Sequence, residues 1–418
     1  MSSKHRTAPV ASLAVLALVV VLSPPSSGQP ALAERAPRGD DAGYLPADKQ
    51  GFGTARPTRS NLWFTLGHGG TTESYYPDLS TPATRQLQLV VTDGRTFVER
   101  LSDVPTRTTP LDAKVPAYRQ VSVGSGWRVA ATYVTDPSRP SLIVKLDVRS
   151  LTGRRLHVFA VHEPTLSKDG SDDRGRTIGG TLVARDESAA SALRATPRFA
   201  ATSSGYLGRN DGWTDLSQDM QMDVERRRAG PGHTGQTGRL AVDGVRHQRA
   251  VLTLGFGTTQ SKAIASAHRS AIAGFATLRA DYERGWKRYA ASLTTPRSVR
   301  SPLERRVYSS SLAMLAASED KQSRGAFVAS PSMPWAWRND ESLAPVPGPY
   351  HLVWPRDLYQ HATALLAAGD RPAANRAWDF LRGVQQSDGH FAQNYETTGE
   401  PHWTSIQLDE TALPIVLA

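Results

Sequence analysis

Residues 127–148 read WRVAATYVTDPSRPSLIVKLDV, and this stretch decides the fold class. Apolar side chains occupy every second position in residues 127–133 and again in residues 142–148. A period of two is typical of a β-strand with one face in a core. Asp136-Pro137 between the two segments is a turn signal. The side chains predicted to face the core are Trp127, Val129, Ala131, Tyr133, Leu142, Val144, Leu146 and Val148.

The same alternation recurs on both sides of this stretch, from about residue 50 to residue 257. The further predicted strands are Asn61–Leu66, Gln86–Val91, Arg155–Val161, Thr237–Val242 and Arg249–Phe256. Turn signals such as Asp93-Gly94 and Asp243-Gly244 separate them. Many short strands at this spacing predict an antiparallel β-sandwich, which we assign to residues 34–260.

The hydrophobic period then changes to three or four residues, which is typical of helices. Residues Lys262–Leu293 are predicted to form one long helix, within a helical linker over residues 261–299. Residues 300–418 are predicted to hold four more helices. These are Pro302–Glu319, Asp357–Ala368, Pro372–Gln386 and Gln407–Ala418. Since four helices ending in an apolar run cannot easily close a core, we expect them to be part of a larger helical domain.

The first 33 residues have the three-part order of a secretory signal peptide. Lys4 to Arg6 are basic, Val10–Leu22 is apolar, and Ala31-Leu32-Ala33 resembles a cleavage site. We therefore expect a secreted, extracellular protein beginning near Glu34, with no membrane contact after cleavage. The alternative is a single N-terminal membrane anchor.

Composition excludes several function classes. The 418 residues include no cysteine, which excludes disulfides, thiolate metal sites and cysteine nucleophiles. The formal charge is +10, but arginine is spread along the chain rather than clustered, so no nucleic-acid partner is expected. His351, His390 and His402 lack the spacing of metal-binding motifs, and we expect neither a metal nor a cofactor.

The densest group of chemically useful residues is Tyr350-His351-Leu352-Val353-Trp354-Pro355-Arg356-Asp357. Aromatic rings can lie on the apolar faces of a sugar, and an arginine and an aspartate can bind its hydroxyls through charge-assisted hydrogen bonds. The segment therefore suggests a sugar site. In the alternative interpretation, Asp357 only caps its helix and pairs with Arg356.

Two later segments again combine aromatic, amide and acidic residues. One is residues 385–394, QQSDGHFAQN, and the other runs from Gly399 to Trp403 and on to Gln407-Leu408-Asp409-Glu410. Trp403 taken alone is as consistent with a core position as with a ligand platform. Both segments follow predicted helices in long loops, and such loops are often functional.

Taken together, these motifs resemble bacterial glucoamylases and glucodextranases of glycoside hydrolase family 15. In the helical half the resemblance rests on residues 318–321, 325–326, 329–330, Pro334-Trp335, 350–357, 367–370, 385–389 and 407–410. In the first half it rests on residues 51–54, 63–66, 135–137, 204–206, 211–213 and 255–257.

The resemblance implies an N-terminal super-β-sandwich, a helical linker and an (α/α)6 barrel of twelve helices. It implies exo-hydrolysis of α-glucosidic bonds in α-glucans, with inversion and release of glucose, in a protein that we expect to be a monomer. It also implies substrate-binding roles for seven residues. Tyr350 and Trp354 match the aromatic residues of the first subsite, Arg356 and Asp357 match the pair that binds the terminal glucose, and Trp403 lies against the substrate, supported by Gln407 and Asp409.

The general acid and general base of this family are glutamates in motifs that this sequence does not contain. Glu396, Glu400 and Glu410 do not lie in those motifs, so no catalytic residue is assigned within the 418 residues. We expect a fragment that is inert by itself, whose catalytic residues would lie beyond Ala418. The alternatives are a relative acting on dextran or trehalose, and a secreted carbohydrate-binding protein without activity.

Overall fold

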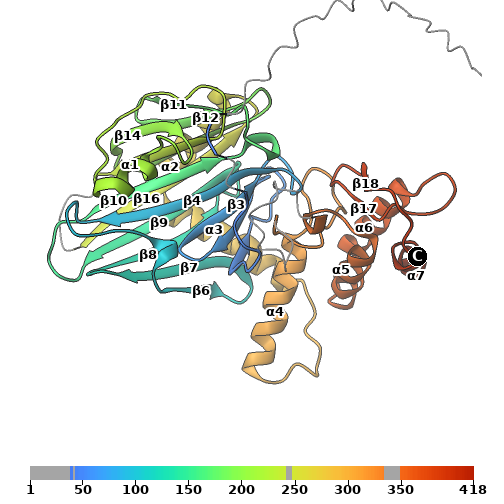
Figure 1. Cartoon of the computed structure of the whole chain (residues 1–418). Helices are drawn as coiled ribbons and strands as arrows, with labels where there is room; N and C mark the ends of the chain where they lie inside the picture. Colours follow the sequence, from blue (N-terminus) through green and yellow to red (C-terminus); the bar gives the residue numbers. More distant parts are fainter. Residues whose placement is uncertain (1–37, 41–42, 242–246, 334–348) are drawn as a thin grey trace, which may run out of the picture. The chain divides into compact units, whose positions relative to one another are not determined.

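The alternating segments of the sequence form strands of two antiparallel sheets that face one another (Figure 1). The computed structural model describes residues 38–40, 43–241, 247–333 and 349–418, and the residues from Pro37 onward form one unit. The predicted signal peptide, residue Val242, the Asp243-Gly244 turn and the Pro334-Trp335 motif lie outside the described residues.

The first sheet has the order β1-β2-β3-β4-β10-β15-β14, with β5 paired to β4. Its strands are β1 (Gly51–Gly53), β2 (Trp63–Gly67), β3 (Gly70–Tyr75), β4 (Pro82–Thr92), β5 (Val98–Arg100), β10 (His157–Pro164), β14 (Phe199–Tyr206) and β15 (Thr234–Leu240). The short helix α1 (Gly212–Asp219) and the 3-10 turns η1 (Leu101–Asp103) and η2 (Leu166–Lys168) lie between strands in the sequence.

The second sheet has the order β11-β12-β13-β16-β9-β8-β7-β6. Its strands are β6 (Thr106–Asp112), β7 (Val115–Gly124), β8 (Trp127–Thr135), β9 (Ser141–Ser150), β11 (Arg174–Ile178), β12 (Thr181–Arg185), β13 (Ala190–Thr196) and β16 (His247–Gly257). The stretch that opened the analysis of the sequence is the β8–β9 hairpin at the middle of this sheet.

The sandwich core contains the side chains that the period of two predicts. All eight alternating residues of β8 and β9 belong to one buried cluster with residues of the first sheet, such as Phe64 and Leu89. The predicted fold class, a β-sandwich followed by helices, is confirmed.

The prediction of one helix over residues 262–293 is wrong, because two helices occupy this region. Helix α2 (Gln260–Ala273) ends at Gly274, and α3 (Phe275–Ala291) begins directly after it. Gly274 has φ 79° and ψ 146°, a conformation that only glycine adopts without strain. The apolar period continues across this break, which is why the sequence alone suggested a single helix.

These two helices cover the outer face of the second sheet. Ala263 and Ala267 of α2 pack on β12 and β13, and an added Cβ at Gly255 of β16 would lie 2.4 Å from the Ala267 nitrogen. Glycine in β16 therefore allows the helix backbone to approach the strand. Helix α3 is tied to the sandwich by Trp286, whose Nε1 donates to the Thr54 carbonyl at 2.8 Å.

The remaining helices follow the predicted ranges closely. They are α4 (Pro302–Ala317), α5 (Pro355–Ala367), α6 (Arg371–Val384) and α7 (Leu408–Leu417), with the 3-10 turn η3 (Pro349–His351) before α5. Helices α5 and α6 lie side by side, and α5 also packs on α7 (Figure 1). The segment Ser387–Ser405, expected to be a loop, contains a small hairpin of β17 (Asn394–Tyr395) and β18 (Pro401–Trp403).

A second buried cluster joins sandwich strands to helices α3 to α6. Trp63 of β2 donates its Nε1 hydrogen bond to the Ala317 carbonyl at 3.0 Å. The Asp320 carboxylate accepts from the Leu79 backbone nitrogen at 2.8 Å. These buried contacts anchor the end of α4 and the segment directly after it to the sandwich.

Gly325 offers a test of this packing. It has φ +94°, and an added Cβ would lie 2.1 Å from the Arg376 carbonyl oxygen of α6. We expect Gly325→Ala to destabilise the protein by about 2 kcal/mol, from strain and crowding together. Chemical denaturation measures this, with Gly383→Ala in α6 as the control. Nothing lies within 4 Å of a Cβ at Gly383, so the control is expected to stabilise by about 0.5 kcal/mol. Equal stability of the two variants would contradict this packing.

Among the described helices, none has both the length and the apolar character that a membrane span requires.

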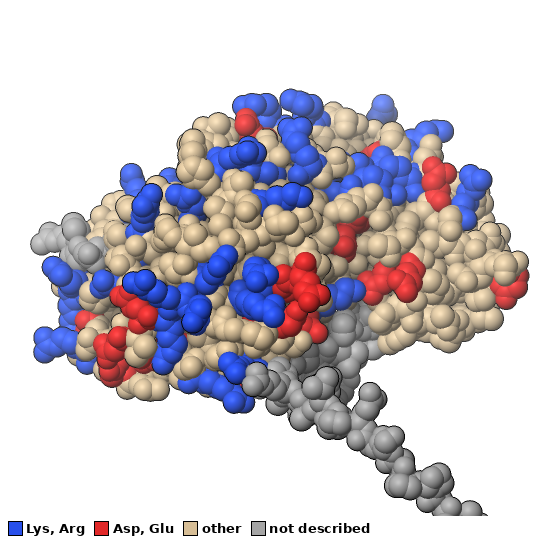
Figure 2. All heavy atoms as spheres, turned by 90° about the horizontal axis from the view of Figure 1, so that it is seen from above, with Lys and Arg blue, Asp and Glu red and all other residues tan. Residues whose placement is uncertain are grey.

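Figure 2 shows one face of the molecule, on which Lys and Arg side chains lie in several separate groups with Asp and Glu beside many of them.

Candidate functional site

The candidate site forms where two helices begin close together. Helices α5 and α7 start at Pro355 and Leu408, and they pack on each other. The first backbone N–H groups of a helix have no partner within it, and the helix dipole makes this end positive. The Arg356 backbone N–H of α5 donates to Oε2 of Glu410 in α7 at 2.7 Å. Glu410 thus caps α5 from a different helix.

Arg356 is the centre of the site, because its guanidinium contacts three carboxylates. Its Nη2 lies 3.1 Å from Asp357 Oδ2, and its Nη1 lies 3.1 Å from Asp409 Oδ2 and 3.0 Å from Glu410 Oε1. The guanidinium carbon also lies 5.2 Å from the centroid of the Trp354 ring. These contacts fix the direction in which the arginine points.

Three aromatic rings form a continuous cluster beside this arginine. The Tyr350 and Trp354 rings stack with centroids 5.0 Å apart at 22°, and Trp354 meets Trp403 edge to face at 5.8 Å and 83°. Trp354 is only 3% exposed, whereas Tyr350 and Trp403 are half-buried. The accessible ring surface therefore comes mainly from Tyr350 and Trp403, with Trp354 behind them.

The β17–β18 hairpin holds Trp403 in this position. The Trp403 backbone nitrogen donates to the Asn394 side chain at 2.9 Å. Val353 and Tyr395 exchange two backbone hydrogen bonds of 2.8 Å, which join the hairpin to the segment before α5. Gln407 accepts from Gln393 at 2.8 Å and so connects the hairpin to the start of α7.

The electrostatics of the three carboxylates differ. Burial raises the pKa of Glu410 to about 7, although Arg356 opposes this shift. Burial also acts to raise the pKa of Asp409, but the hydrogen bond from Arg356 outweighs it and the pKa of Asp409 is lowered. The carboxylates in turn raise the pKa of Arg356 against its own desolvation. Arg356 is therefore a permanent cation, while Glu410 can exchange a proton near neutral pH.

The structure thus brings together the residues that the sequence singled out as substrate-binding. A continuous chain of contacts connects Tyr350, Trp354, Arg356, Asp357, Trp403 and Asp409, and Gln407 contacts Asp409 through its side chain. Their roles toward a substrate stay predictions. The alternative interpretation of Asp357 had two parts. Its side chain does not cap α5, but it does pair with Arg356.

Glu410 is the residue that sequence reasoning missed. It had been set aside with Glu396 and Glu400, of which Glu396 binds Lys168 at 3.0 Å and Glu400 is exposed. The one available signal was its place next to Asp409 in the first turn of a predicted helix, where a carboxylate is favoured. Nothing in the sequence indicated that it would contact Arg356.

The pKa of Glu410 leads to a prediction about pH. A carboxyl group with a raised pKa in the folded state binds a proton on folding, so its stabilising contribution is complete below about pH 4.5 and is lost as the pH rises to about 7. We expect Glu410→Gln to remove this part of the pH dependence. The Tm of the variant relative to the unmodified chain should therefore increase between pH 5 and pH 8, as measured by calorimetry.

Glu400→Gln is the matched control, because Glu400 is exposed and the same charge is removed. Its Tm difference from the unmodified chain should stay constant over this pH range. A constant difference for Glu410→Gln as well would show that Glu410 is ionised throughout.

Such an arrangement is suited to binding a neutral polyol. Half-buried rings cover apolar C–H faces, and an arginine held between carboxylates offers donors and acceptors side by side.

The three histidines considered in the sequence lie apart from one another. His351 contacts the Ser80 carbonyl, His390 contacts Asp388, and His402 lies 3.7 Å from Glu396.

Comparisons with known proteins identify the family of both halves of the chain. Residues 33–291 match the family model "Glucodextranase, domain N", and residues 303–392 match "Glycosyl hydrolases family 15". A glucoamylase from a Clostridium species is 32% identical over 391 residues, which are 91% of this chain and 54% of that protein. An uncharacterised glycosyl hydrolase from Methanocaldococcus jannaschii is 38% identical over 61 residues, 15% of this chain and 10% of that protein.

The solved structures include a bacterial glucoamylase complexed with acarbose. It superimposes with a TM-score of 0.83 at 31% identity, over 91% of this chain and 56% of that one. The chain thus spans about half the length of the glucoamylases that it matches.

Proposed function

The chain belongs to glycosyl hydrolase family 15 and has the glucodextranase-type N domain. We therefore propose that it provides the substrate-binding residues of an enzyme that hydrolyses α-glucosidic bonds in α-glucans. The observation that carries this proposal is the Arg356 site. An arginine held by Asp357 and Asp409, beside the rings of Tyr350 and Trp403, matches the needs of a glucose ring.

In this proposal the described residues bind the non-reducing end of the glucan. The carboxylate side chains of Asp357 and Asp409 are 30% and 42% exposed, so both retain oxygens that can accept from sugar hydroxyls. Arg356 donates to the same hydroxyls, and Tyr350 and Trp403 cover the ring face. Binding of the terminal ring at this site would favour release of single glucose units from a chain end.

The same contacts argue that the described carboxylates are not the general acid and general base of the hydrolysis. Inverting hydrolysis needs a general acid and a general base about 6.5–9.5 Å apart, with room for a water molecule at the base. Asp357, Asp409 and Glu410 instead converge on one guanidinium. We therefore propose that both proton-transferring glutamates lie outside the described residues and that the 418-residue chain binds without hydrolysing.

The test is to incubate the purified chain with maltotetraose and to follow free glucose enzymatically. We expect binding without glucose release above the buffer control. Rapid release would contradict the assignment of the described carboxylates to binding alone. Failure to bind any α-glucan would contradict the proposed function itself.

The linkage of the glucan is a separate question, and the match to a glucodextranase domain favours testing α-1,6 bonds. A panel of maltotetraose, isomaltotetraose and trehalose separates the starch, dextran and trehalose candidates by their dissociation constants. A purely carbohydrate-binding role remains the second candidate, since all three carboxylates of the site contact Arg356. It predicts binding without hydrolysis also in the longest natural form of the protein.

We also propose that the protein is exported, because its first 33 residues have the order of a secretory signal peptide. Expression with residues 1–33 intact, followed by N-terminal sequencing of secreted material, tests this. A mature terminus near Glu34 is expected, and retention in the membrane fraction would indicate an anchor.

A further inference from the structure

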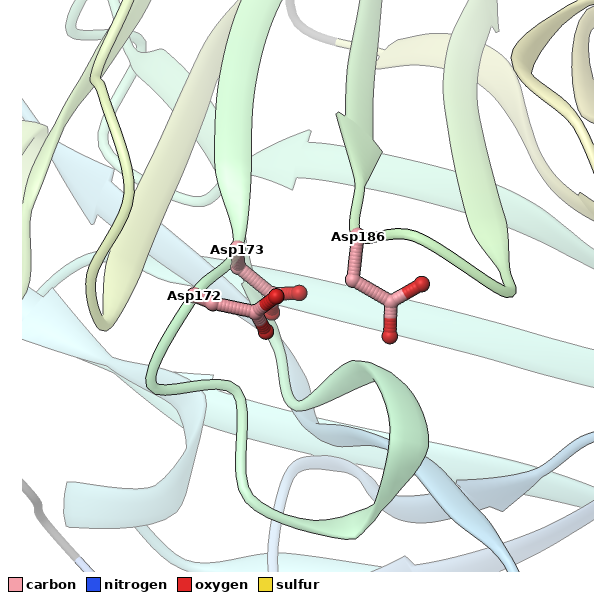
Figure 3. A group of neighbouring side chains, drawn as sticks. All are labelled: Asp172, Asp173 and Asp186. Atoms are coloured by element: carbon pink, nitrogen blue, oxygen red, sulfur yellow. The ribbon is translucent and has the colours of Figure 1, made fainter.

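Three aspartates of the sandwich domain converge at one end of the second sheet. Asp172 and Asp173 come just before β11, and Asp186 comes just after β12. The two strands pair antiparallel, with Arg174 opposite Arg185, so the residues next to that pair meet across the ladder. Figure 3 shows the Asp172 and Asp173 carboxylates extending toward Asp186. One oxygen of each lies within 4.8 Å of the other two.

The two buried members of this group, Asp173 and Asp186, lack the counter-charges that the buried Glu73 and Glu319 have. Glu73 lies 2.9 Å from Lys49, and Glu319 is paired with Arg324 and Arg376. Among the residues that the structure describes, Asp172, Asp173 and Asp186 form no ion pair with a lysine or arginine. Lys168, on the adjacent turn η2, instead contacts both oxygens of Glu396 at 3.0 Å.

Asp173 provides a second, independent observation. Its side chain is fully buried, and Oδ2 accepts from the Leu166 backbone nitrogen at 3.2 Å. Its Oδ1 has no hydrogen-bond partner among the described residues. Buried Asp320, by comparison, accepts backbone hydrogen bonds on both oxygens. Leaving a buried carboxylate oxygen without a donor is unfavourable, so the Asp173 oxygen points to a ligand that carries positive charge.

The local electrostatics agree with this need. Burial raises the pKa of Asp173 well above its usual value, and the charges of Asp186, Asp172 and Asp169 raise it further. Burial and the charges of Asp186 and Asp169 also raise the pKa of Asp172, with Arg174 as the opposing charge. A cation between the carboxylates would remove both effects.

We propose that Asp172, Asp173 and Asp186 bind a divalent cation of the calcium type. The donors are all hard oxygens, whereas zinc sites use mainly nitrogen and sulfur. Calcium takes six to eight oxygen ligands in flexible geometry, while magnesium keeps several waters and uses one or two carboxylates. Thr165 on the same segment has a buried hydroxyl without a hydrogen-bond partner among the described residues, which is a further oxygen of the required kind.

The cation would join the segment 165–173 to the β11–β12 hairpin. That segment carries Lys168, which forms an ion pair with Glu396 in the turn between β17 and β18. Strand β18 contains Trp403. Binding of the cation should therefore stabilise the sandwich. Through the ion pair of Lys168 and Glu396 it should also help to hold Trp403 in position. The proposal does not depend on the activity of the protein.

Calcium titration of the EDTA-treated 418-residue chain tests the proposal. We expect one binding event per chain by calorimetry and a saturable rise in Tm of roughly 3 °C at a calcium concentration about 100 times Kd. Magnesium at the same concentration and sodium chloride at the same ionic strength should each give a clearly smaller rise. Equal responses to all three salts would overturn the proposal.

Variants of two of the three aspartates locate the site. Asp172 is exposed, so Asp172→Asn should fold normally and still weaken calcium binding at least about tenfold by removing one charged ligand. Asp173→Asn, which removes a buried charged ligand, should also weaken calcium binding at least about tenfold. Asp219→Asn is the matched control, since Asp219 is exposed and also has an acidic neighbour, Asp223. Unchanged calcium affinity in Asp172→Asn would overturn the assignment, whereas a loss confined to the first two variants would support it.

Discussion

Arg356→Ala is expected to destabilise the protein by about 3–5 kcal/mol, the usual cost of removing one partner of a buried ion pair. The substitution leaves Glu410, whose side chain is fully buried, without its counter-charge. Because Glu410 can take up a proton instead, the loss should be larger at pH 8 than at pH 5. Urea denaturation at the two pH values measures both quantities.

The double variant Arg356→Ala with Glu410→Gln provides the control. It removes the buried charge together with its partner, so we expect it to recover a large part of the stability lost at pH 8. If the two substitutions were additive, Arg356 and Glu410 would not be coupled, and the central contact of the site would be refuted.

Asp357→Ala is expected to weaken the binding of maltotetraose by about 30- to 150-fold, which corresponds to about 2–3 kcal/mol for a charge-assisted hydrogen bond. Asp357 contacts only Arg356 among the charged groups of the site, and its side chain is 30% exposed. The fold should therefore survive, with a Tm close to that of the unmodified chain. Titration calorimetry gives the affinity.

Asp379→Ala is the matched control for this experiment. Asp379 is an exposed aspartate on α6, paired weakly with Arg382 at 3.7 Å. Its replacement should leave maltotetraose affinity unchanged. A wild-type affinity in Asp357→Ala would remove Asp357 from the binding site, whatever the control does.

The parts of the fold that could be predicted from the sequence are those whose apolar residues recur at a regular spacing. Strands β8 and β9 alternate because only one side of each lies between the two sheets. Strand β3 could not be found in this way, because its six residues, GTTESY, include four polar ones and show no apolar alternation, although all six are buried. Glu73 within it is neutralised by Lys49, a partner 24 residues away that no local pattern indicates.

The break at Gly274 shows a second limit. Apolar residues recur at helical spacing on both sides of it, because α2 and α3 both pack on the sandwich. A single glycine within a periodic segment is compatible with a continuous helix or with a break. Only the positive φ at Gly274, which the tertiary contacts of both helices require, distinguishes the two.

The candidate site was predictable where its residues are neighbours in sequence. The segment Tyr350–Asp357 brings the aromatic and charged groups together locally, and only their link to Asp409 needed the fold. Glu410 was missed because its contact joins two helices that begin more than fifty residues apart in sequence. The cluster of Asp172, Asp173 and Asp186 was missed for the same reason, since hairpin register creates it.

The most direct test of the central claim is saturation-transfer NMR of maltotetraose with the purified 418-residue chain. If the Arg356 site holds a terminal glucose, the protons of the non-reducing ring should receive the strongest saturation, and Asp357→Ala should abolish it. Saturation spread evenly along the sugar, or unchanged in Asp357→Ala, would contradict the claim that Tyr350, Arg356, Asp357 and Trp403 bind the end of the glucan.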